Sequence, residues 1–275
     1  MMPLTDKEFT AIREFVYSYA GINLTEQKKA LVIGRLQKLV LKNDFDNFTD
    51  YLDWVKNQGG AAAVEEMINR ISTNHTFFFR EKAHFDFLST TALKDVEELM
   101  AKQRTRDLRL WCAAAATGEE PYTLAMLLRD HFGPEYGKLD AGLLATDIST
   151  SALATAHAGV FSDDRVSLVP AKLKARFLKN IGPDQWAVSP ELKKDILYRR
   201  FNLMTERWPF KGRFHIIFCR NVMIYFDQKT RNELTAKFHH FLHPGGYFFI
   251  GHSETLGREN TPFEYVMPAV YRRRK

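Results

Sequence analysis

Residues 107–120 read DLRLWCAAAATGEE, and this stretch decides the fold of the 275-residue chain. Its first eight residues, which are apolar except for Asp107 and Arg109, read as a short buried strand. A turn that contains Gly118 and Pro121 follows, and a helix is predicted from there through Leu128. A strand that leads through a short turn into a helix is the first half of a β–α–β unit, so the stretch predicts a parallel sheet covered by helices.

The same alternation repeats further along the chain. Apolar runs at 142–147 (GLLATD), 214–219 (FHIIFC) and 246–251 (GYFFIG) are predicted strands. Ser149 caps a predicted helix after the first run, and a helix over 231–242 lies between the other two. Strands that alternate with helices predict the α/β class, with a doubly wound, Rossmann-like parallel sheet.

Residues 160–200 interrupt this alternation. They are polar, contain three prolines, and have strand-like pieces only at 186–188 and 196–200. We therefore predict an inserted β-subdomain with its own small structure at about 160–200.

The first 70 residues have a different pattern, which is helical throughout. Thr5 and Asp6 can cap a first helix, and Thr25 begins a second. No alternation typical of strands appears before Thr76. We predict a small all-helical domain over 1–70 and the sheet domain over 71–275.

Composition excludes several classes of protein. Hydrophobic residues make up 45% of the chain and charged residues 26%, which is typical of a globular protein and excludes a disordered one. The longest stretch without a charge, 238–253, is shorter than the about 18–20 apolar residues that span a bilayer. The N-terminus lacks a signal pattern, and two cysteines cannot form a disulfide framework. We expect a cytoplasmic protein that is not embedded in a membrane.

Positive charge gathers on one predicted helix of the N-terminal domain. Residues 1–69 hold 8 Lys and Arg against 10 Asp and Glu, yet residues 26–42 hold five basic residues and a single acidic one. Four of the five fall close to one helical face: Lys28, Arg35, Lys38 and Lys42. The pattern fits either a solvated face or a docking face for an acidic partner.

Two features of the sheet domain point to a nucleoside ligand. Ligands of open α/β sheets lie beyond the carboxyl ends of the strands, where the sequence has the small-residue run 113–118 and, after the next strand, Asp147. No glycine-rich phosphate loop is present. A small-residue turn with an acid for the ribose hydroxyls favours S-adenosylmethionine (AdoMet). Asp147 could instead cap a helix, and Glu119 could either face the ligand or lie on the surface.

Two other segments combine charged and aromatic residues. An Arg220-Asn221 pair follows the run at 214–219 and leads to Tyr225, whereas residues 73–81 join three phenylalanines to Arg80. The second segment could also be a core aromatic patch in which Arg80 is paired with Glu81 or another acid.

Six stretches together resemble the chemotaxis receptor methyltransferase (CheR) family. They are NHTFFFRE at 74–81, WCAAAATGEEPYTLAM at 111–126, LLATDIS at 143–149, FNL at 201–203, FCRNVMIYFD at 218–227 and HPGGYFFIGHSE at 243–254. Their order and spacing extend over the whole chain, including the helical N-terminal domain. One departure is Ala116, where the family pattern has Ser.

The resemblance implies transfer of the AdoMet methyl group to glutamate side chains of membrane chemoreceptors, which forms methyl esters and S-adenosylhomocysteine. Glu119 would contact the methionine part of the cofactor, Asp147 the ribose, and Asn202 and Leu203 the adenine. The other implied pocket residues are Asn74, Thr76, Arg80, Arg220 and Asn221.

The implied reaction requires the enzyme to position the substrate but not to activate it. A glutamate carboxylate has a pKa near 4.3 and is already a nucleophile at pH 7, so no general base is needed. Arg80 is the natural holder of that carboxylate, and Tyr225 could contribute a hydroxyl to the same task. No metal is expected, because the histidines at 239–243 have no carboxylate or cysteine beside them.

The implied partner is the cytoplasmic domain of methyl-accepting chemotaxis receptors, whose acidic surface would give the basic helix its docking role. The 160–200 insertion resembles the family's β-subdomain, which in some members binds a peptide at the receptor's C-terminus. We expect a monomer that is recruited to membrane receptor arrays.

Two alternatives remain open. The basic pI of 9.2 and the Arg-rich tail at 272–275 suggest a nucleic-acid methyltransferase. Against it, the Arg220-Asn221 position lacks the Asn/Asp-Pro-Pro-aromatic signature, and no Pro-Cys nucleophile is present. The second alternative is a non-catalytic adaptor that binds AdoMet and receptors.

Overall fold

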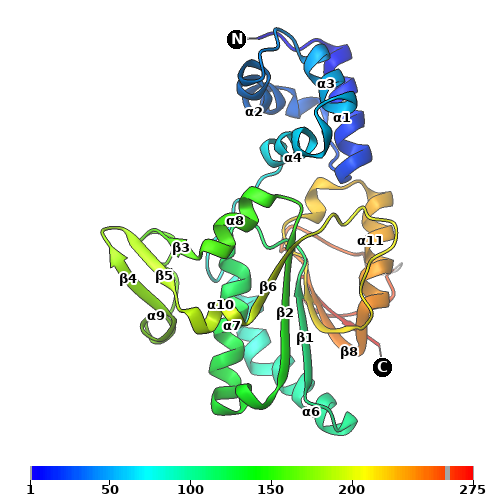
Figure 1. Ribbon diagram of the computed structural model, residues 1–275. Helices are drawn as coiled ribbons and strands as arrows, with labels where there is room; N and C mark the ends of the chain where they lie inside the picture. Colours follow the sequence, from blue (N-terminus) through cyan, green and yellow to red (C-terminus); the bar gives the residue numbers. More distant parts are fainter. Residues whose placement is uncertain (1, 258–260, 275) are drawn as a thin grey trace.

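A computed structural model describes residues 2–257 and 261–274 of the chain. Figure 1 shows a cluster of helices at the N-terminus that lies above a larger sheet domain. The cluster comprises α1 (Asp6–Ala20), the short η1 (Glu26–Lys28), α2 (Lys29–Lys42), α3 (Phe48–Asn57) and α4 (Gly60–Ile71).

Each helix of this cluster has an apolar face that packs against the others. Phe9, Val16, Leu36, Phe48 and Met67 are buried together at its centre. Thr5 caps α1 as predicted, because its hydroxyl accepts from the Glu8 amide while the Glu8 carboxylate accepts from the Thr5 amide. The N-terminal residues therefore form a helical unit with its own core.

The sheet domain contains a seven-stranded sheet in the order β6-β2-β1-β7-β8-β10-β9. The five parallel strands are β1 (Asp107–Cys112), β2 (Asp140–Asp147), β6 (Ile196–Arg200), β7 (Phe214–Phe218) and β8 (Leu242–Phe249). The strand order reverses at β1, which lies between β2 and β7. This confirms the predicted doubly wound parallel sheet and places a ligand-binding crevice at the end of β1.

An antiparallel hairpin completes the sheet beside β8. It consists of β9 (Phe263–Met267) and β10 (Val270–Arg273), and β10 pairs with β8. The sequence analysis does not predict this hairpin. Its strands are short and half exposed, so they lack the continuous apolar run that identifies a buried parallel strand.

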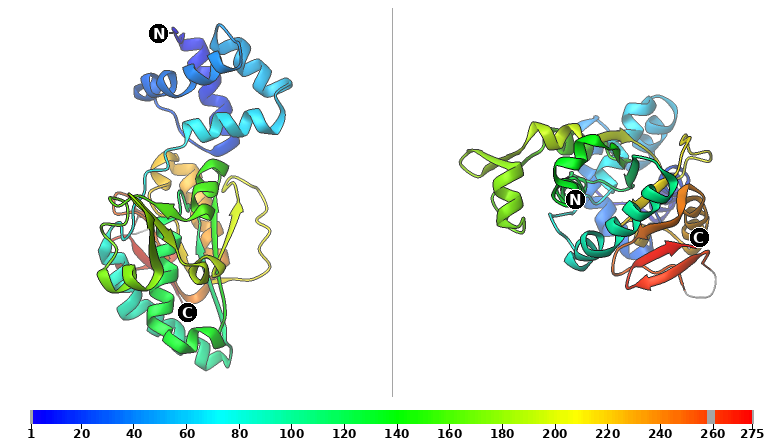
Figure 2. Two further views of the ribbon diagram at one scale, coloured as in Figure 1. Left: turned by 60° about the vertical axis from the view of Figure 1, so that its left-hand side comes forward. Right: turned by 90° about the horizontal axis from the view of Figure 1, so that it is seen from below.

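Helices cover both faces of the sheet (Figure 2). They are α5 (Lys82–Phe87), η2 (Leu88–Ala92), α6 (Leu93–Gln103), α7 (Glu119–Phe132), η3 (Gly133–Lys138), α8 (Thr150–Ala158) and α11 (Gln228–Phe241). Along β1, Leu110 belongs to one hydrophobic core and Trp111 to the other. Burial on both faces explains why the sequence is continuously apolar from Leu110 to Ala114.

A second, three-stranded sheet projects to one side of the main sheet (Figure 2, right). It contains β3 (Val160–Phe161), β4 (Leu178–Gly182) and β5 (Gln185–Val188), and it is accompanied by α9 (Ala171–Phe177) and α10 (Pro190–Lys194). The strand-like piece at 186–188 lies in β5, as expected. Residues 196–200 differ from the expectation, since they form β6 and pair with β2 in the main sheet. A short apolar run shows that a strand forms but not which sheet it joins.

No helix within the described residues is both long and apolar enough to cross a lipid bilayer. The two cysteines, Cys112 and Cys219, are free and buried.

Candidate active site

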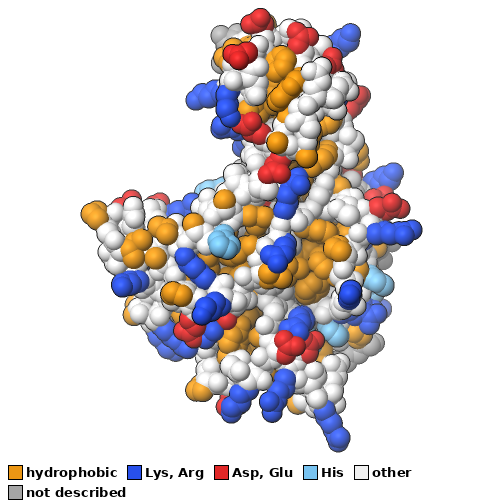
Figure 3. Space-filling view, viewed as in Figure 1, with side chains coloured by type: hydrophobic (Ala, Val, Ile, Leu, Met, Phe, Trp, Pro, Cys, Tyr) orange, Lys and Arg blue, Asp and Glu red, His pale blue; other side chains and the backbone are white. Residues whose placement is uncertain are grey.

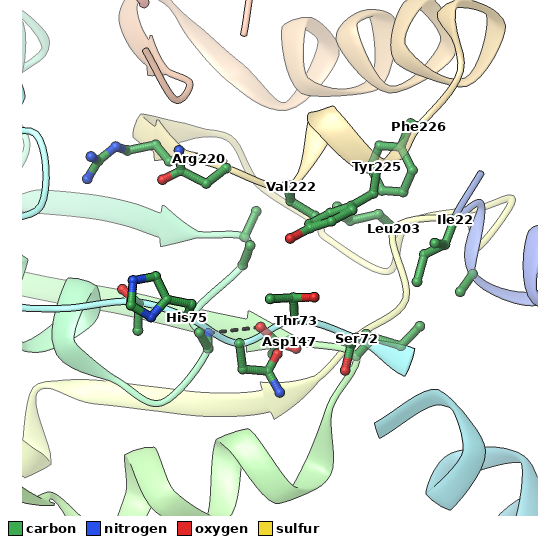
Figure 4. A pocket seen from close by; sticks show the side chains of 18 of the residues that line it. Ile22, Ser72, Thr73, His75, Asp147, Leu203, Arg220, Val222, Tyr225 and Phe226 are labelled. Carbon is green, nitrogen blue, oxygen red and sulfur yellow. Dashed lines mark hydrogen bonds between the residues drawn. The ribbon is translucent and has the colours of Figure 1, made fainter. Parts of the chain in front are cut away.

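A pocket opens at the carboxyl ends of β1, β2 and β7, beneath the helical domain (Figure 4). Its open space is about 910 Å³, including the part that is continuous with solvent. Ala20, Ile22 and Ile71 of the helical domain form part of its wall. Of the residues assigned to the site from the sequence, those that line it are Asn74, Thr76, Arg80, Asp147, Asn202, Leu203, Arg220, Asn221 and Tyr225.

The small-residue turn after β1 forms the floor of this pocket. Ala113, Ala114 and Ala116 line it. Gly118 has a φ of 103°, and a Cβ there would lie 2.9 Å from the backbone of Ala156. The turn therefore needs glycine at 118, both for its left-handed backbone and for its close contact with α8.

Asp147 ends β2 and is 92% buried, with its carboxylate at the edge of the pocket. The Ala116 amide donates to Oδ2 at 2.8 Å and the Ser149 amide to Oδ1 at 2.9 Å. Burial raises the pKa of Asp147, and these backbone donors oppose the rise. Ser149 and not Asp147 caps α8, so the interpretation of Asp147 as the helix cap is wrong. The Asp147 side chain orders the turn, and each of its oxygens keeps a further lone pair for a ligand.

The two glutamates that begin α7 have different surroundings. Glu119 is fully buried, pairs with Arg165 and accepts from the Thr117 hydroxyl at 2.8 Å, and it does not line the pocket. Its neighbour Glu120 does line the pocket. The structure therefore does not bring Glu119 to the place expected for it. Adjacent residues of a helix point about 100° apart, so only one of the two glutamates can face the pocket. The sequence does not indicate which one, because it does not give the rotation of the helix.

Arg220 is the centre of a buried ionic network in the pocket wall. Its guanidinium donates to Glu120 Oε2 at 2.7 Å and to Glu81 Oε2 at 2.9 Å. It also donates to the Arg80 carbonyl and lies over the ring of Phe85. Two carboxylates share this cation, and Arg80, which lines the same pocket, also attracts the Glu120 carboxylate.

The pKa values of the two carboxylates in the network shift in opposite directions. Burial works to raise the pKa of Glu81, but Arg220, with hydrogen bonds from Asn221 and the His252 amide, lowers it overall. Burial raises the pKa of Glu120 despite the attraction of Arg220. The sequence analysis assigns no role to Glu81 or Glu120, although both lie within the motifs that resemble the family.

Arg80 lines the same pocket but has few partners. Its guanidinium donates to the His75 carbonyl at 2.9 Å and lies over the ring of Phe77. Glu81 pairs with Arg220 instead, and no carboxylate among the described residues pairs with Arg80. The interpretation of Arg80 as a core residue paired with Glu81 is therefore wrong, and its guanidinium is available to an acidic substrate.

Tyr225 lies opposite the small-residue turn, and Figure 4 shows its hydroxyl directed into the pocket. Its carbonyl accepts from the Asn23 amide at 2.7 Å, and the Lys28 ammonium lies 5.4 Å from the centre of its ring. Both contacts join the helical domain to the sheet domain at the pocket mouth.

Glu254 holds the loop that carries Asn221 and Tyr225. Its buried carboxylate accepts from the amides of Asn221, Ile224 and Gly251. These bonds stabilise a left-handed backbone at Asn221, whose φ is 57°. Sequence reasoning missed this role, because a glutamate 33 residues from its partner gives no local signal.

Asn202 and Leu203 complete the pocket wall near the helical domain. The Asn202 amide group donates to the Tyr19 carbonyl at 2.6 Å, and its oxygen accepts from the Met204 amide at 3.0 Å. Leu203 is buried beside them. Asn202 thus joins α1 to the sheet domain as well as lining the pocket.

The four basic residues predicted on one helical face lie at the end of η1 (Lys28) and in α2, and they have separate environments. Lys28 faces Tyr225, and the Arg35 guanidinium donates to the carbonyls of Ile71 and Ser72 at the end of α4. Lys42 pairs with Glu66 at 2.7 Å. Lys38 alone of the four is exposed without an ionic partner among the described residues.

Two family models match the chain over nearly its whole length. They are the CheR methyltransferase all-alpha domain over residues 7–72 and the CheR methyltransferase SAM-binding domain over residues 74–271. The chain belongs to the CheR methyltransferase family. Membership in the CheR family makes it an AdoMet-dependent methyltransferase of chemotaxis.

Individual CheR relatives agree with this assignment. The chemotaxis protein methyltransferase of Borreliella burgdorferi is 42% identical over 270 residues, which cover 98% of this chain and 95% of that protein. The chemotaxis protein methyltransferase of Escherichia coli is 34% identical over 273 residues, with 98% and 92% covered. Neither a nucleic-acid methyltransferase nor a non-catalytic adaptor is favoured.

The positive charge that suggested nucleic acid forms no single patch on the face seen in Figure 3. On the face seen in Figure 3, Lys and Arg side chains are scattered among acidic and apolar ones and form no continuous strip. Of the basic tail, Arg272 and Arg273 bond to backbone carbonyls of the sheet domain, and Lys275 lies outside the described residues.

Proposed function

We propose that the protein transfers the methyl group of AdoMet to glutamate side-chain carboxylates of chemoreceptors. The observation that carries this proposal is Arg80. Its guanidinium lines the pocket and donates to a carbonyl, and none of the carboxylates that the structure describes forms an ion pair with it. A planar guanidinium in that state suits the capture of a carboxylate from another molecule.

The pocket has the features that AdoMet requires. Apolar side chains of Ile148, Phe201 and Leu203 lie near Asp147 and suit a purine beside a ribose. The Glu120 carboxylate, which lines the pocket, suits the cationic sulfonium and ammonium groups. When bound, AdoMet supplies an electrophilic methyl group on a positively charged sulfur. We assign Asp147 to the ribose and Glu120, in place of Glu119, to the methionine end, with Asn74, Thr76 and Asn221 as further polar contacts.

The protein's residues have only to position the nucleophile. A substrate glutamate is ionised at pH 7, so no base has to remove a proton. Arg80 would bind one edge of the carboxylate and Tyr225 would donate its hydroxyl, which leaves an oxygen directed at the cofactor. Alignment of this kind can supply several kcal/mol of the barrier reduction. The pairing with Arg80 must stay moderate, because a tight ground-state complex would slow transfer.

Receptor docking is assigned to the exposed side of α2. Lys38 is the member of the basic set that remains free for an acidic receptor bundle, and the exposed Leu31 and Leu41 lie on the same helix. Lys28 and Arg35 would contribute long-range attraction, since their partners are a ring and uncharged carbonyls, whereas Lys42 is paired with Glu66 and would contribute less. The three-stranded sheet would receive a receptor C-terminal peptide in receptors that have one.

The remaining parts of the proposal concern the setting of the reaction. The enzyme would act as a monomer in the cytoplasm, recruited to receptor arrays, without nucleic acid and without a metal in the methyl-transfer step.

The test of this function is radiolabelled methyl transfer from AdoMet to receptor-containing membranes, followed by mild alkaline treatment. Volatile methanol released by base is expected, because carboxyl methyl esters hydrolyse there. Base-stable label would contradict glutamate methylation, and label on added nucleic acid would favour the alternative enzyme class.

A further inference from the structure

The described residues contain a cluster of metal-ligating side chains behind the pocket wall, formed by Glu81, His84 and His252. Glu81 precedes α5, His84 lies within α5, and His252 follows β8. One ligand atom from each lies within 4.8 Å of the other two. His84 is fully buried whereas His252 is exposed, so the cluster can be reached from solvent on one side.

The state of His84 is the strongest indication that a ligand belongs here. Its ring is fully buried, and neither nitrogen makes a hydrogen bond of ordinary geometry. Nδ1 lies 3.4 Å from Glu81 Oε2, and the Pro268 carbonyl also lies near the ring. Buried polar groups without partners are uncommon and destabilising, and a buried imidazole between a carboxylate and a carbonyl is the usual setting of a metal ligand.

We propose that Glu81, His84 and His252 bind a divalent transition-metal ion such as Zn²⁺. Two imidazoles and one carboxylate are a common ligand set for zinc, and water would complete the coordination. In a tetrahedral zinc site with bonds of about 2.1 Å, neighbouring ligand atoms are about 3.4 Å apart. Glu81 Oε2 and His84 Nδ1 already have that separation. The exposed His252 is the ligand that has to move inward.

The charges around the cluster permit a cation. Arg220 opposes a metal ion, but it is paired with the carboxylates of Glu81 and Glu120, which offset its charge.

Metal binding at this cluster would be coupled to the pocket. The Glu81 carboxylate also accepts from Arg220 and Asn221, and both of these residues line the pocket. A metal ion would compete for the same oxygens and loosen that wall, so it should weaken cofactor binding. This coupling rests on the proposed function, whereas metal binding itself does not. By reciprocity, bound cofactor would weaken metal binding by the same factor.

The experiment titrates the full-length protein with Co²⁺, whose visible absorption reports histidine coordination in a low-coordinate site, and then displaces it with Zn²⁺. We expect intense absorption bands that Zn²⁺ abolishes. His252→Ala, a change at an exposed position, should weaken Zn²⁺ binding measured by calorimetry by about tenfold or more. The matched control is His157→Ala, which removes an exposed histidine of α8. Absence of the bands, or equal affinities of the two variants, would overturn the site.

A second titration tests the coupling separately. Saturating Zn²⁺ should weaken S-adenosylhomocysteine binding several-fold in the wild-type protein and in His157→Ala, but not in His252→Ala. If Zn²⁺ binds and cofactor affinity does not change, the coupling is wrong while the metal site stands. Failure of methyl transfer to receptors would affect neither binding measurement.

Discussion

Arg80 and Arg220 line the same pocket and each lies over a phenylalanine ring, yet they differ in burial and in ionic partners. The Arg220 side chain is fully buried and pairs with two carboxylates. Arg80 is half-buried and donates to one carbonyl. The protein thus pairs one guanidinium with its own carboxylates and leaves the other open. A paired arginine organises the wall, whereas an unpaired arginine can bind a substrate.

Arg220→Ala should have the largest effect, and the effect should be on folding. The change leaves Glu81 and Glu120 buried without their cation, and breaking a buried ion pair costs about 3–5 kcal/mol. Urea unfolding monitored by circular dichroism measures this loss. Arg80→Ala is the matched control and should lose less than about 1 kcal/mol, because it breaks no buried ion pair. Equal losses in the two variants would remove the distinction between the arginines.

Asp147→Ala should mainly affect cofactor binding. The variant loses an acceptor for the ribose and also the bonds that order the turn at Ala116. We expect S-adenosylhomocysteine affinity to fall by about 1–3 kcal/mol. Calorimetry measures it, and Glu119→Gln serves as the comparison, since Glu119 does not line the pocket. Unchanged affinity in Asp147→Ala would refute the assignment.

The Glu81 carboxylate should contribute to the pH dependence of stability. Its folded pKa lies below the ordinary value of 4.5, so its contribution is present above pH 4.5 and is lost as pH falls through the folded value. Glu81→Gln should therefore destabilise the protein at pH 7 and reduce the loss of stability on acidification. Urea midpoints between pH 7 and the acid range test this. A constant difference between variant and wild type at every pH would mean that Glu81 makes no ionic contribution.

Charge reversal at Lys38 should have the smallest effect. Lys38 is exposed, so Lys38→Glu should leave cofactor affinity and folding unchanged and raise the receptor KM by a factor that shrinks in high salt. Lys56→Glu, on the neighbouring helix α3, controls for net charge. Equal KM values in the two variants would mean that Lys38 does not contact the receptor and is an ordinary solvated residue.

The sequence was sufficient to predict the fold where hydrophobic patterning is strong. All of β7 and the last three residues of β1 are buried, and the apolar residues there predict both strands correctly. The pairing of residues 196–200 with β2 was missed, because pairing depends on contacts between distant segments. The β9–β10 hairpin was also missed, because its short, partly exposed strands have too few apolar residues to be recognised as strands.

The site was predictable to a similar degree. Nine of the ten site residues predicted from the motifs line the pocket. The motifs do not show that Glu120 and not Glu119 is the glutamate that lines it. The roles of Glu254 and His84 were invisible in the sequence, since their partners are far along the chain or buried in the folded state.

The measurement that tests the central claim most directly compares Arg80→Ala with the wild-type protein in two assays. One is calorimetric S-adenosylhomocysteine affinity, and the other is the turnover of radiolabelled methyl transfer to receptor membranes. If Arg80 holds the substrate carboxylate, turnover should fall by at least about tenfold, which corresponds to about 1.4 kcal/mol, while cofactor affinity stays the same. Equal losses in both assays would contradict the claim and show that Arg80 serves the cofactor.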